Sequence, residues 1–326
     1  MAYKVKNLIA SKPGLAKVTD PELHYQVFTF LKNEDTKEIL LWTPVLRREG
    51  NNKTIYLASY TLDGQIIDKV LVPDTSIEFT ALQDMDINTS QGFVITNGQE
   101  KAAGTIFLAA ADEGSYLYGY NELLSKIVSK DYEPNEEDNW ITGFDIFDKY
   151  IYTVSDDEFA RVTVYDYNFK QITDRFPFPR QLPDNYLQVN IKVIYNLVYV
   201  VSVSNNGGVV YVYNLDGTFV RTLINDPELQ NAWSIVKAPK DFGYFKCSYL
   251  MASKGTINAY DKNGQFLGKL KDAQGNVIVI ENLYYLKFLD EKLYFAAGNI
   301  AARDEDTNTA LIGYICPDKK AKCKKY

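Results

Sequence analysis

A tyrosine at the end of a strand-like run, followed by a turn and a second strand-like run, recurs six times along this chain. The tyrosines are Tyr60, Tyr120, Tyr165, Tyr213, Tyr260 and Tyr314. The clearest copies read ASYTLDGQIIDKVLV, YVYNLDGTFVRTLI and NAYDKNGQFLGKLK. Short strands that repeat with a period of roughly 40–50 residues predict one four-stranded sheet per repeat, and hence a β-propeller.

Turn chemistry supports the hairpins. Asp63-Gly64, Asp216-Gly217 and Asn263-Gly264 stand where a tight hairpin requires a positive φ. The third repeat has Asn168-Phe169 at the same place, which predicts a weaker turn.

We therefore expect an all-β, six-bladed β-propeller that forms a single domain over residues 1–316. The blades are expected at residues 22–73, 78–131, 140–178, 186–224, 232–271 and 283–315. The last blade has sequence for only three strands, and an open edge would leave N–H and C=O groups unpaired. Residues 3–11 are expected to pair beside Thr309–Ile315 and close the ring. The alternative is a disordered N-terminus.

Charge and composition limit the partners. The chain has 326 residues, a formal net charge of −7 and a sequence pI of about 5.0, so an acidic body argues against phosphate binding as the main function. A short basic tail, residues 317–326, lies outside the blades and is expected to be disordered. It carries Lys319, Lys320, Lys322, Lys324 and Lys325. These lysines could bind nucleic acid weakly, or could simply aid solubility.

The N-terminus MAYKVKNLIASKPG lacks the apolar core of a signal peptide, and no window approaches the roughly 18 apolar residues of a membrane helix. We expect a soluble, monomeric protein that is cytoplasmic or associated with a particle and makes no membrane contact. Cys247 is expected to be a buried thiol in a strand. Cys316 and Cys323 are either free thiols or a bridge over the tail.

The residues predict no catalytic group. His24 is the sole histidine, and no Gly-x-Ser-x-Gly elbow accompanies it, which excludes a conventional Ser-His-Asp triad. His24 is expected to be a structural or surface residue.

Oxygen-bearing side chains do occur near the predicted inner strands, and a hard cation such as Ca²⁺ prefers oxygen ligands. The candidates for a calcium site in the central channel are Asp84, Asp86, Asn88, Asp145, Asn190, Glu281 and Asn282. Asn190 is the leading candidate. The alternative is a channel lined by polar residues that holds water and no metal, since any propeller of this kind places polar groups there.

Three stretches resemble a family of uncharacterised six-bladed propellers related to NHL-repeat proteins. They read VKNLIASKPGLAKVTDPEL, DNYLQVNIKVIYNLVYVVSVSNNGGVVYVYNLDGTFVRTLI and KAPKDFGYFKCSYLMASKGTINAYDKNGQFLGKLKDAQGNVIVIENLYYLKF. The resemblance covers nearly the whole chain and implies six blades. It implies no activity, because the family has no agreed biochemical function.

The chain departs from that family in two ways. Members usually carry Trp-Gly at the start of several innermost strands, where this chain reads His24-Tyr25, Trp233-Ser234 and Tyr284-Tyr285. This puts any shared ligand site in the channel in doubt. Members are mostly predicted secreted bacterial proteins, whereas this chain shows no leader and uses Tyr, Asn, Lys and Ile heavily. Both facts suggest a relative in a large DNA virus or its mobile elements.

A rigid propeller serves more often as an interaction platform than as an enzyme. The sequence therefore favours a non-enzymatic binding or scaffold protein that needs no cofactor and presents its surface to a protein partner. One alternative is a Ca²⁺-dependent hydrolase of lactones or esters. Another is a structural component of a particle or nucleoprotein that uses the basic tail.

Overall fold

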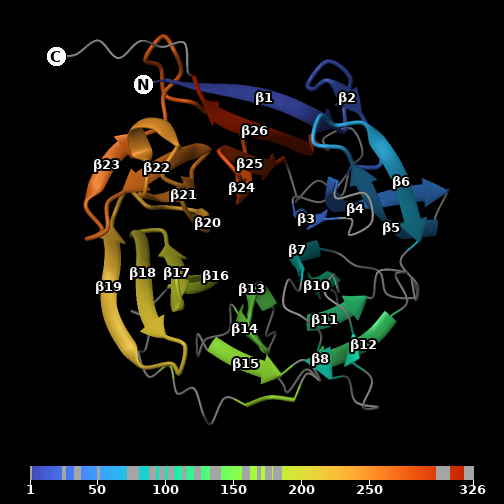
Figure 1. The fold of residues 1–326 in the computed structure, drawn as a ribbon, viewed down its shortest axis with the longest axis horizontal. Coiled ribbons are helices and arrows are strands. Elements are labelled where there is room, and N and C mark those ends of the chain that lie inside the picture. Colours follow the sequence, from blue (N-terminus) through green and yellow to red (C-terminus); the bar gives the residue numbers. More distant parts are fainter. Residues whose placement is uncertain are drawn as a thin grey trace.

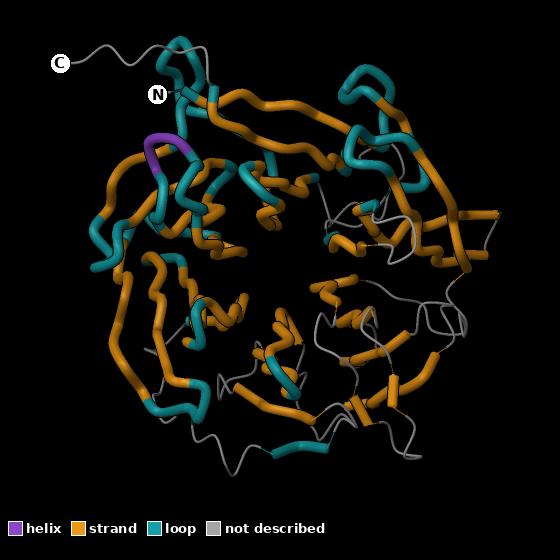
Figure 2. The backbone as a smooth tube through the Cα atoms, viewed as in Figure 1, coloured by secondary structure: helices purple, strands orange, loops and turns teal. Residues whose placement is uncertain are grey.

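The structure is a computed structural model built almost entirely from antiparallel strands (Figures 1 and 2). It describes residues 2–23, 27–32, 38–49, 52–71, 81–87, 93–94, 100–101, 106–111, 115–120, 126–132, 141–155, 162–166, 170–172, 178, 186–298 and 309–318. No helix in this part of the chain has the length and apolar composition needed to cross a membrane.

The strands form sheets that follow one another along the chain. The first contains β3 (Thr29–Lys32), β4 (Ile39–Glu49), β5 (Asn52–Tyr60) and β6 (Ile66–Leu71). The next contains β7 (Ala81–Ile87), β10 (Ile106–Ala111), β11 (Ser115–Tyr120) and β12 (Lys126–Tyr132). Between its first two strands, β8 (Phe93–Val94) and β9 (Glu100–Lys101) form a small ribbon.

The following sheet contains β13 (Ile141–Phe147), β14 (Tyr150–Ser155) and β15 (Val162–Asp166). After it come β16 (Leu187–Ile194), β17 (Leu197–Ser204), β18 (Gly207–Asn214) and β19 (Phe219–Asp226). The next sheet contains β20 (Ala232–Lys237), β21 (Tyr249–Ser253), β22 (Thr256–Tyr260) and β23 (Phe266–Lys269), with a 3-10 turn at Gly243–Phe245. The last sheet joins β24 (Leu283–Leu289), β25 (Lys292–Ala297) and β26 (Leu311–Pro317) to the N-terminal β1 (Tyr3–Ala10) and β2 (Val18–Thr19).

These sheets stand side by side around a common axis, so the fold is a β-propeller (Figure 1). The strands nearest the axis are β3, β7, β13, β16, β20 and β24. Each of these strands is an end strand of its sheet, and its free edge faces the axis.

The predicted number of blades is wrong. The structure shows five complete blades, which are the five sheets of four or more strands, whereas β13, β14 and β15 form a sheet of three. The fourth strand expected there is reduced, among the described residues, to one bridge between Gln171 and Tyr165. The turn itself closes as in the other hairpins, because the N–H of Asp166 donates to the carbonyl of Lys170 at 3.0 Å and the N–H of Ile172 donates to the carbonyl of Val164 at 2.8 Å. The sequence beyond Ile172 reads TDRFPFPR, and its two prolines have no N–H to donate to a neighbouring strand.

The N-terminal strand pairs as predicted. β1 runs antiparallel to β26, from Tyr3 opposite Pro317 to Ala10 opposite Leu311. The side chain of Tyr3 is buried, and its hydroxyl donates to the carbonyl of Phe242 and accepts from the N–H of Phe245, both at 3.1 Å. These hydrogen bonds attach β1 to the neighbouring sheet, which contains β20 to β23.

Hairpin tips connect neighbouring sheets. The tip glycines Gly64, Gly217 and Gly264 all have positive φ, at 95°, 82° and 85°, which confirms the predicted turns. Gly264 lies so close to the preceding sheet that an added Cβ would stand 1.5 Å from the carbonyl oxygen of Leu223. The Arg221 guanidinium, on the same preceding sheet, donates to the carbonyl of Lys262 at 2.9 Å.

The same tetrapeptide precedes the first strand of two sheets. Asp-Pro-Glu-Leu occurs at residues 20–23 and 226–229. In both copies the aspartate accepts a hydrogen bond from the glutamate N–H, and the leucine is fully buried. In both copies the aspartate also accepts from the hydroxyl of a tyrosine that ends the third strand of the sheet that follows.

The core fills the spaces between adjacent sheets. Cys247 was expected within it as a buried thiol in a strand, and this is wrong. Cys247 is exposed in a turn with a φ of 57°, because the chain there bends through the 3-10 turn before β21 begins. Cys316 is a half-buried free thiol, and Cys323 lies outside the described residues.

Candidate functional site

Five inner strands carry a β-bulge at the same place. In β7, β13, β16, β20 and β24 one extra residue interrupts the pairing with the second strand. The extra residues are Gln83, Thr142, Val189, Trp233 and Tyr284. Because a bulge re-aims the side chains that follow it, these registers align the inner strands with one another around the channel.

The alignment defines two layers. The residues directly after the bulge are Asp84, Gly143, Asn190, Ser234 and Tyr285. The residues two positions further along are Asp86, Asp145, Lys192, Val236 and Lys287. The calcium candidates Asp86 and Asp145 therefore belong to a layer that also contains two lysines.

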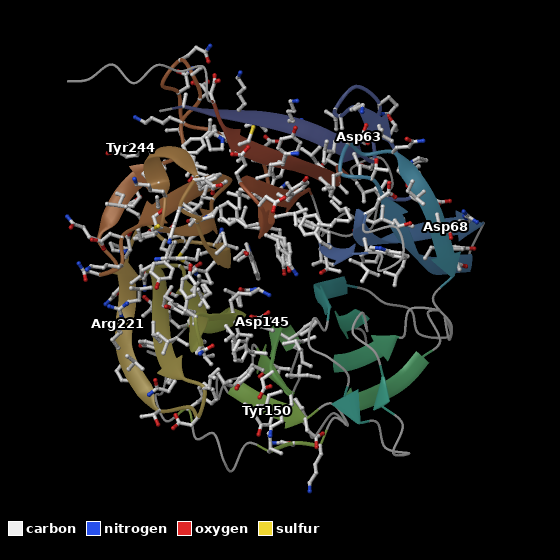
Figure 3. All side chains as sticks on the ribbon, viewed as in Figure 1. Asp63, Asp68, Asp145, Tyr150, Arg221 and Tyr244 are labelled. Atoms are coloured by element: carbon white, nitrogen blue, oxygen red, sulfur yellow. The ribbon has the colours of Figure 1, made fainter. Side chains whose placement is uncertain are left out.

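Lys192 lies beside Asp145, and Figure 3 shows Asp145 on the side of its sheet that faces the axis. The Lys192 ammonium lies 3.7 Å from a carboxylate oxygen of Asp145 and donates to the carbonyl of Phe144 at 3.1 Å. It also stands 5.7 Å from the ring centroid of Tyr285 on β24. The other Asp145 oxygen accepts from the N–H of Val193. The ammonium of Lys192 thus balances the negative charge of the Asp145 carboxylate, so a metal ion is not needed for this purpose.

Other side chains on the inner strands form hydrogen bonds or ring contacts with the neighbouring inner strand. Ser234 donates to the carbonyl of Leu286 at 3.4 Å and accepts from its N–H at 3.2 Å. Lys287 donates to the hydroxyl of Thr29 at 3.1 Å. The bulge residues Trp233 and Tyr284 stack with ring centroids 4.9 Å apart. The inner edges, which would otherwise be open, are therefore bound to the neighbouring strand.

Asn190 is the candidate with spare bonding capacity. Its side chain is buried, and its Oδ1 has no hydrogen-bond partner among the described residues. The residue packs against Gly143, since a Cβ built on that glycine would lie 3.1 Å from the Asn190 Cα. A buried carbonyl oxygen without a partner fits a water molecule or a cation.

The remaining calcium candidates do not form one donor set in the described part of the chain. Glu281 and Asn282 lie in an exposed turn before β24, and Asn282 has a φ of 49°. No three His, Cys, Asp or Glu side chains come together among the described side chains. The side chain of Asp86 falls outside them, as do Asp84 and Asn88. A metal ion in the channel therefore stays a prediction. The positive charge of Lys192 beside Asp145 disfavours a second cation at that place.

The other predicted site residues lie outside the described residues. They are His24, Lys319, Lys320, Lys322, Lys324 and Lys325.

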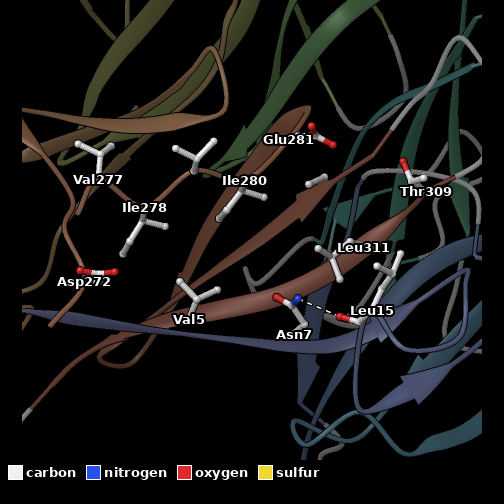
Figure 4. A pocket seen from close by; sticks show the side chains of 12 residues that line it. Val5, Asn7, Leu15, Asp272, Val277, Ile278, Ile280, Glu281, Thr309 and Leu311 are labelled. Atoms are coloured by element: carbon white, nitrogen blue, oxygen red, sulfur yellow. Dashed lines mark hydrogen bonds between the residues drawn. The ribbon is translucent and has the colours of Figure 1, made fainter. Parts of the chain in front are cut away.

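A groove of about 500 Å³ lies beside the closing strand (Figure 4). One wall belongs to the last sheet, through Val5, Asn7, Ala297 and Leu311, and Leu15 and Thr309, which lie outside the strands, join it. The other wall is the segment that leads from β23 to β24, through Asp272 and residues 277–281. Asn7 donates from its side-chain amide to the carbonyl of Leu15 at 2.9 Å, which fixes one rim.

The groove gathers apolar side chains that remain in solvent. Val5, Leu15, Val277 and Val279 are four of the twelve large apolar side chains that are exposed in the described structure. Val279 is 67% exposed. The twelve lining residues include the carboxylates of Asp272 and Glu281 but no lysine, arginine or histidine. An apolar concavity with a few polar groups is the usual form of a binding site.

The candidate list from the sequence missed this groove, apart from Glu281. The segment KDAQGNVIVIENL contains a run of four apolar residues, in which Ile278 and Ile280 are buried while Val277 and Val279 stay exposed. A short run with apolar residues on both faces was the available signal. The sequence of this segment does not show that Val277 and Val279 lie opposite β1, because that arrangement depends on the pairing of β1 with β26.

The chain matches no protein-family model. It is 25% identical to the uncharacterised protein R648 of Acanthamoeba polyphaga mimivirus, over 97% of this chain and 81% of that protein. It is 26% identical to the uncharacterised protein L690 of the same virus, over 97% of this chain and 86% of that protein. These relatives support the expected link with a virus. The relation to NHL-repeat proteins stays a prediction.

A solved structure with a similar fold is the complex of the GH93 α-L-arabinofuranosidase of Fusarium graminearum with arabinobiose. The TM-score is 0.61 at 11% identity, and the match covers 96% of this chain and 98% of that chain. At this identity the likeness shows the β-propeller fold alone.

Proposed function

We propose that this protein is a non-enzymatic binding protein whose groove beside the closing strand takes up an apolar part of a partner protein. The observation that carries the proposal is that several exposed aliphatic side chains lie together in one concavity. Val279 is the most exposed of them. Monomeric proteins rarely leave such side chains in a shared hollow unless it serves an interaction.

The groove is built to be rigid. The N–H of Tyr3 donates to the carbonyl of Lys271 at 3.0 Å, which ties the strand wall to the loop wall. Lys271 also bridges to Val277, and the N–H of Ile280 donates to the carbonyl of Gly255 at 2.8 Å. A preorganised surface loses little entropy when a partner binds.

The channel offers weaker support for a hydrolase. Lys192 already neutralises Asp145 there, and its position disfavours a second cation. We therefore place the binding function in the groove rather than at the axis.

The test compares two exposed valines that differ in place. Val279 lines the groove, whereas Val220 lies on the outer strand β19 and is also exposed. Immobilised wild-type protein, Val279→Asp and Val220→Asp are incubated with a lysate of the cells in which the protein occurs, and cross-linked contacts are mapped by mass spectrometry. We expect cross-links at the groove and at least about a tenfold loss of capture for Val279→Asp alone, because a buried unpaired carboxylate is costly.

Equal capture by both variants would contradict the proposal. A rise in the unfolding temperature with Ca²⁺ that EDTA reverses and Asn190→Ala abolishes would favour the hydrolase instead.

A further inference from the structure

We propose that the part of the partner that binds in this groove is an extended, basic peptide segment, which adds as a β-strand to residues 277–279. The inference rests on the proposed function and names the chemistry and the backbone form of what binds there. Three observations lead to it. They are the open backbone edge of one wall, the apolar side chains beside that edge, and the sign of the charges at its two ends.

One wall of the groove is an extended segment that is paired along one edge. The N–H of Ile278 donates to the carbonyl of Leu270, just after β23, at 3.0 Å. The N–H of Ile280 donates to the carbonyl of Gly255, in the turn between β21 and β22, at 2.8 Å. The two isoleucine side chains are buried, and the valines that alternate with them are exposed. This alternation is that of a β-strand, which here is attached to the sheet of β20 to β23.

The opposite edge of this segment is open. In a β-strand the N–H and C=O groups of successive residues point to opposite sides, so those of Val277 and Val279 point away from Leu270 and Gly255. No hydrogen bond joins these backbone groups to any residue in the described part of the chain. An unpaired strand edge is a template for another strand, and extended peptides bind proteins by this route.

The side chains beside the open edge favour an aliphatic peptide. A strand added along the segment places every second side chain on the same face as Val277 and Val279. Aliphatic side chains at those positions would remove the two valines from water, and Val5 and Leu15 on the other wall are exposed apolar partners for the same side chains. Strand addition thus accounts for the exposed apolar side chains on both walls.

The charges of the groove favour a basic peptide. Its lining residues include the carboxylates of Asp272 and Glu281 and no lysine, arginine or histidine. Asp272 lies near one end of the segment, because Lys271 bridges to Val277, and Figure 4 shows Glu281 at the opposite end. From Val277 to Glu281 an extended chain measures roughly 13 Å. Two cations at roughly this spacing on the added strand match the two carboxylates.

Both carboxylates are available to a cation. Burial by itself would raise the pKa of Asp272, but hydrogen bonds from the backbone of Asn276 and Gln274 and from the Asn276 amide lower it. Asp272 is therefore ionised at neutral pH. Glu281 is exposed, and its carboxylate has no hydrogen bond or ion pair within the described structure. A lysine or arginine on the peptide is attracted to both ends of the segment.

A peptide library tests the chemistry. Random nonapeptides displayed on phage are selected on the immobilised full-length protein, with Val279→Asp used for counter-selection. We expect the enriched peptides to alternate aliphatic residues and to carry lysine or arginine. Enrichment of acidic peptides, of peptides with helical periodicity, or of none beyond the counter-selection would overturn the inference.

The charge contribution is measured on one enriched peptide. It is synthesised with a fluorescein label, and its dissociation constant is measured by fluorescence anisotropy. We expect Glu281→Gln to weaken binding about threefold at low salt. Glu228→Gln is the matched control, because Glu228 is exposed and does not line the groove. Equal affinities for the two variants would contradict the role of charge.

Backbone pairing has its own test. The same peptide is made in two forms that carry N-methyl groups on alternate residues, in one register or the other. Only one set of N–H groups faces the segment in a strand pair, so we expect one form to lose at least about tenfold in affinity and the other to keep it. The unmodified peptide should also slow the hydrogen exchange of Val277 and Val279.

The outcomes separate this inference from the proposed function. Equal affinities of the two N-methylated forms, or unchanged exchange at residues 277–279, would overturn strand addition. Capture from the lysate that still depends on Val279 would then leave the binding function intact. If the peptides add to the segment as expected but Val279→Asp leaves capture unchanged, the proposed function fails and the open edge alone is established.

Discussion

The hydroxyl of Tyr60 donates a 2.6 Å hydrogen bond to the buried carboxylate of Asp20, forty residues earlier in the chain. Tyr260 makes the same bond to Asp226 at 2.9 Å. Each aspartate begins an Asp-Pro-Glu-Leu turn at the entry to its sheet, and each tyrosine ends the third strand of that sheet. The repeated tyrosine thus fastens the start of a sheet to its hairpin.

Replacing Tyr60 with phenylalanine should destabilise the protein more than Tyr260→Phe. Asp20 is 1% exposed and would lose one of the donors that compensate its burial, whereas Asp226 keeps access to water. We expect a loss of about 1–3 kcal/mol for Tyr60→Phe and less than about 1 kcal/mol for Tyr260→Phe. Urea unfolding followed by fluorescence measures both, and a larger loss at Tyr260 would refute the role of burial.

Gly264→Ala should be far more damaging than Gly275→Ala. Both glycines have a positive φ, at 85° and 90°, so both substitutions cost about 1 kcal/mol of backbone strain. Only at Gly264 would the new Cβ collide with the carbonyl of Leu223, while Gly275 has no atom within 4 Å. We expect a further loss of about 1–3 kcal/mol or more for Gly264→Ala. Thermal unfolding of the two variants should differ accordingly, and matching midpoints would disprove the inter-sheet contact.

Tyr3→Phe should loosen the closing strand. The substitution leaves the N–H of Phe245 and the carbonyl of Phe242 without their side-chain partner, while the ring that stacks on Phe245 stays in place. Burial raises the pKa of the Tyr3 hydroxyl to about 12, more than the backbone hydrogen bonds lower it, so the group stays a neutral donor. We expect a loss of about 1–3 kcal/mol.

The effect should be local as well as global. Hydrogen exchange should accelerate in β1 and β26 before it does in β17 and β18. Uniform acceleration across all sheets would argue against a specific role for Tyr3 in closure.

Glu22 should make stability depend on acidic pH. Burial alone would raise the pKa of Glu22, but hydrogen bonds and charge from Arg47 and Lys69 outweigh it and lower the pKa below its ordinary 4.5. A group whose pKa is lowered in the folded state stabilises that state above its unfolded pKa. The stabilisation is lost as the pH falls below about 4.5 through the folded value.

The measurement is the unfolding temperature between pH 7 and pH 3. In Glu22→Gln the decline over this range should be shallower than in the wild type, because the titrating carboxylate is gone. Asp63 is a useful contrast, since its pKa is also lowered, by Lys17 and Thr61, but at a fully exposed turn. Asp63→Asn should leave the slope nearly unchanged, and parallel curves for all three proteins would rule out Glu22.

Lys192→Met should destabilise the channel. The substitution leaves the Asp145 carboxylate and the Phe144 carbonyl facing the axis without their cation. Breaking a largely buried pair in this way costs about 2–4 kcal/mol. The double variant Lys192→Met with Asp145→Asn should recover part of the loss, because it removes the uncompensated charge. Additive losses in the urea unfolding of Lys192→Met, Asp145→Asn and the double variant would show that the two side chains act independently.

Local sequence predicted the strands and turns well where the signal was local. Asp63-Gly64, Asp216-Gly217 and Asn263-Gly264 gave hairpins because only the short-range requirement for positive φ had to be met. The closing strand followed from a simple count, since the last sheet lacked a partner and residues 3–11 were unassigned. The blade count failed at the third repeat, where the sheet has three strands and the sequence after Ile172 contains two prolines.

The candidate sites were predicted less well. Asp145 was predicted as a metal ligand from its residue type alone. The sequence could not show that Lys192, which lies 47 residues away on a different strand, would be its neighbour. The groove escaped notice because Val5 and Val279 are brought together only when the ends of the chain pair.

The sequence by itself determined that this protein is a β-propeller, because strand alternation, turn glycines and the repeated tyrosine are properties of segments a few residues long. The tertiary structure alone decided how many blades are complete, which carboxylates are neutralised and which apolar side chains remain in solvent. Those outcomes depend on contacts between sheets, and the strength of an ion pair or an apolar contact is set by burial and distance rather than by residue type.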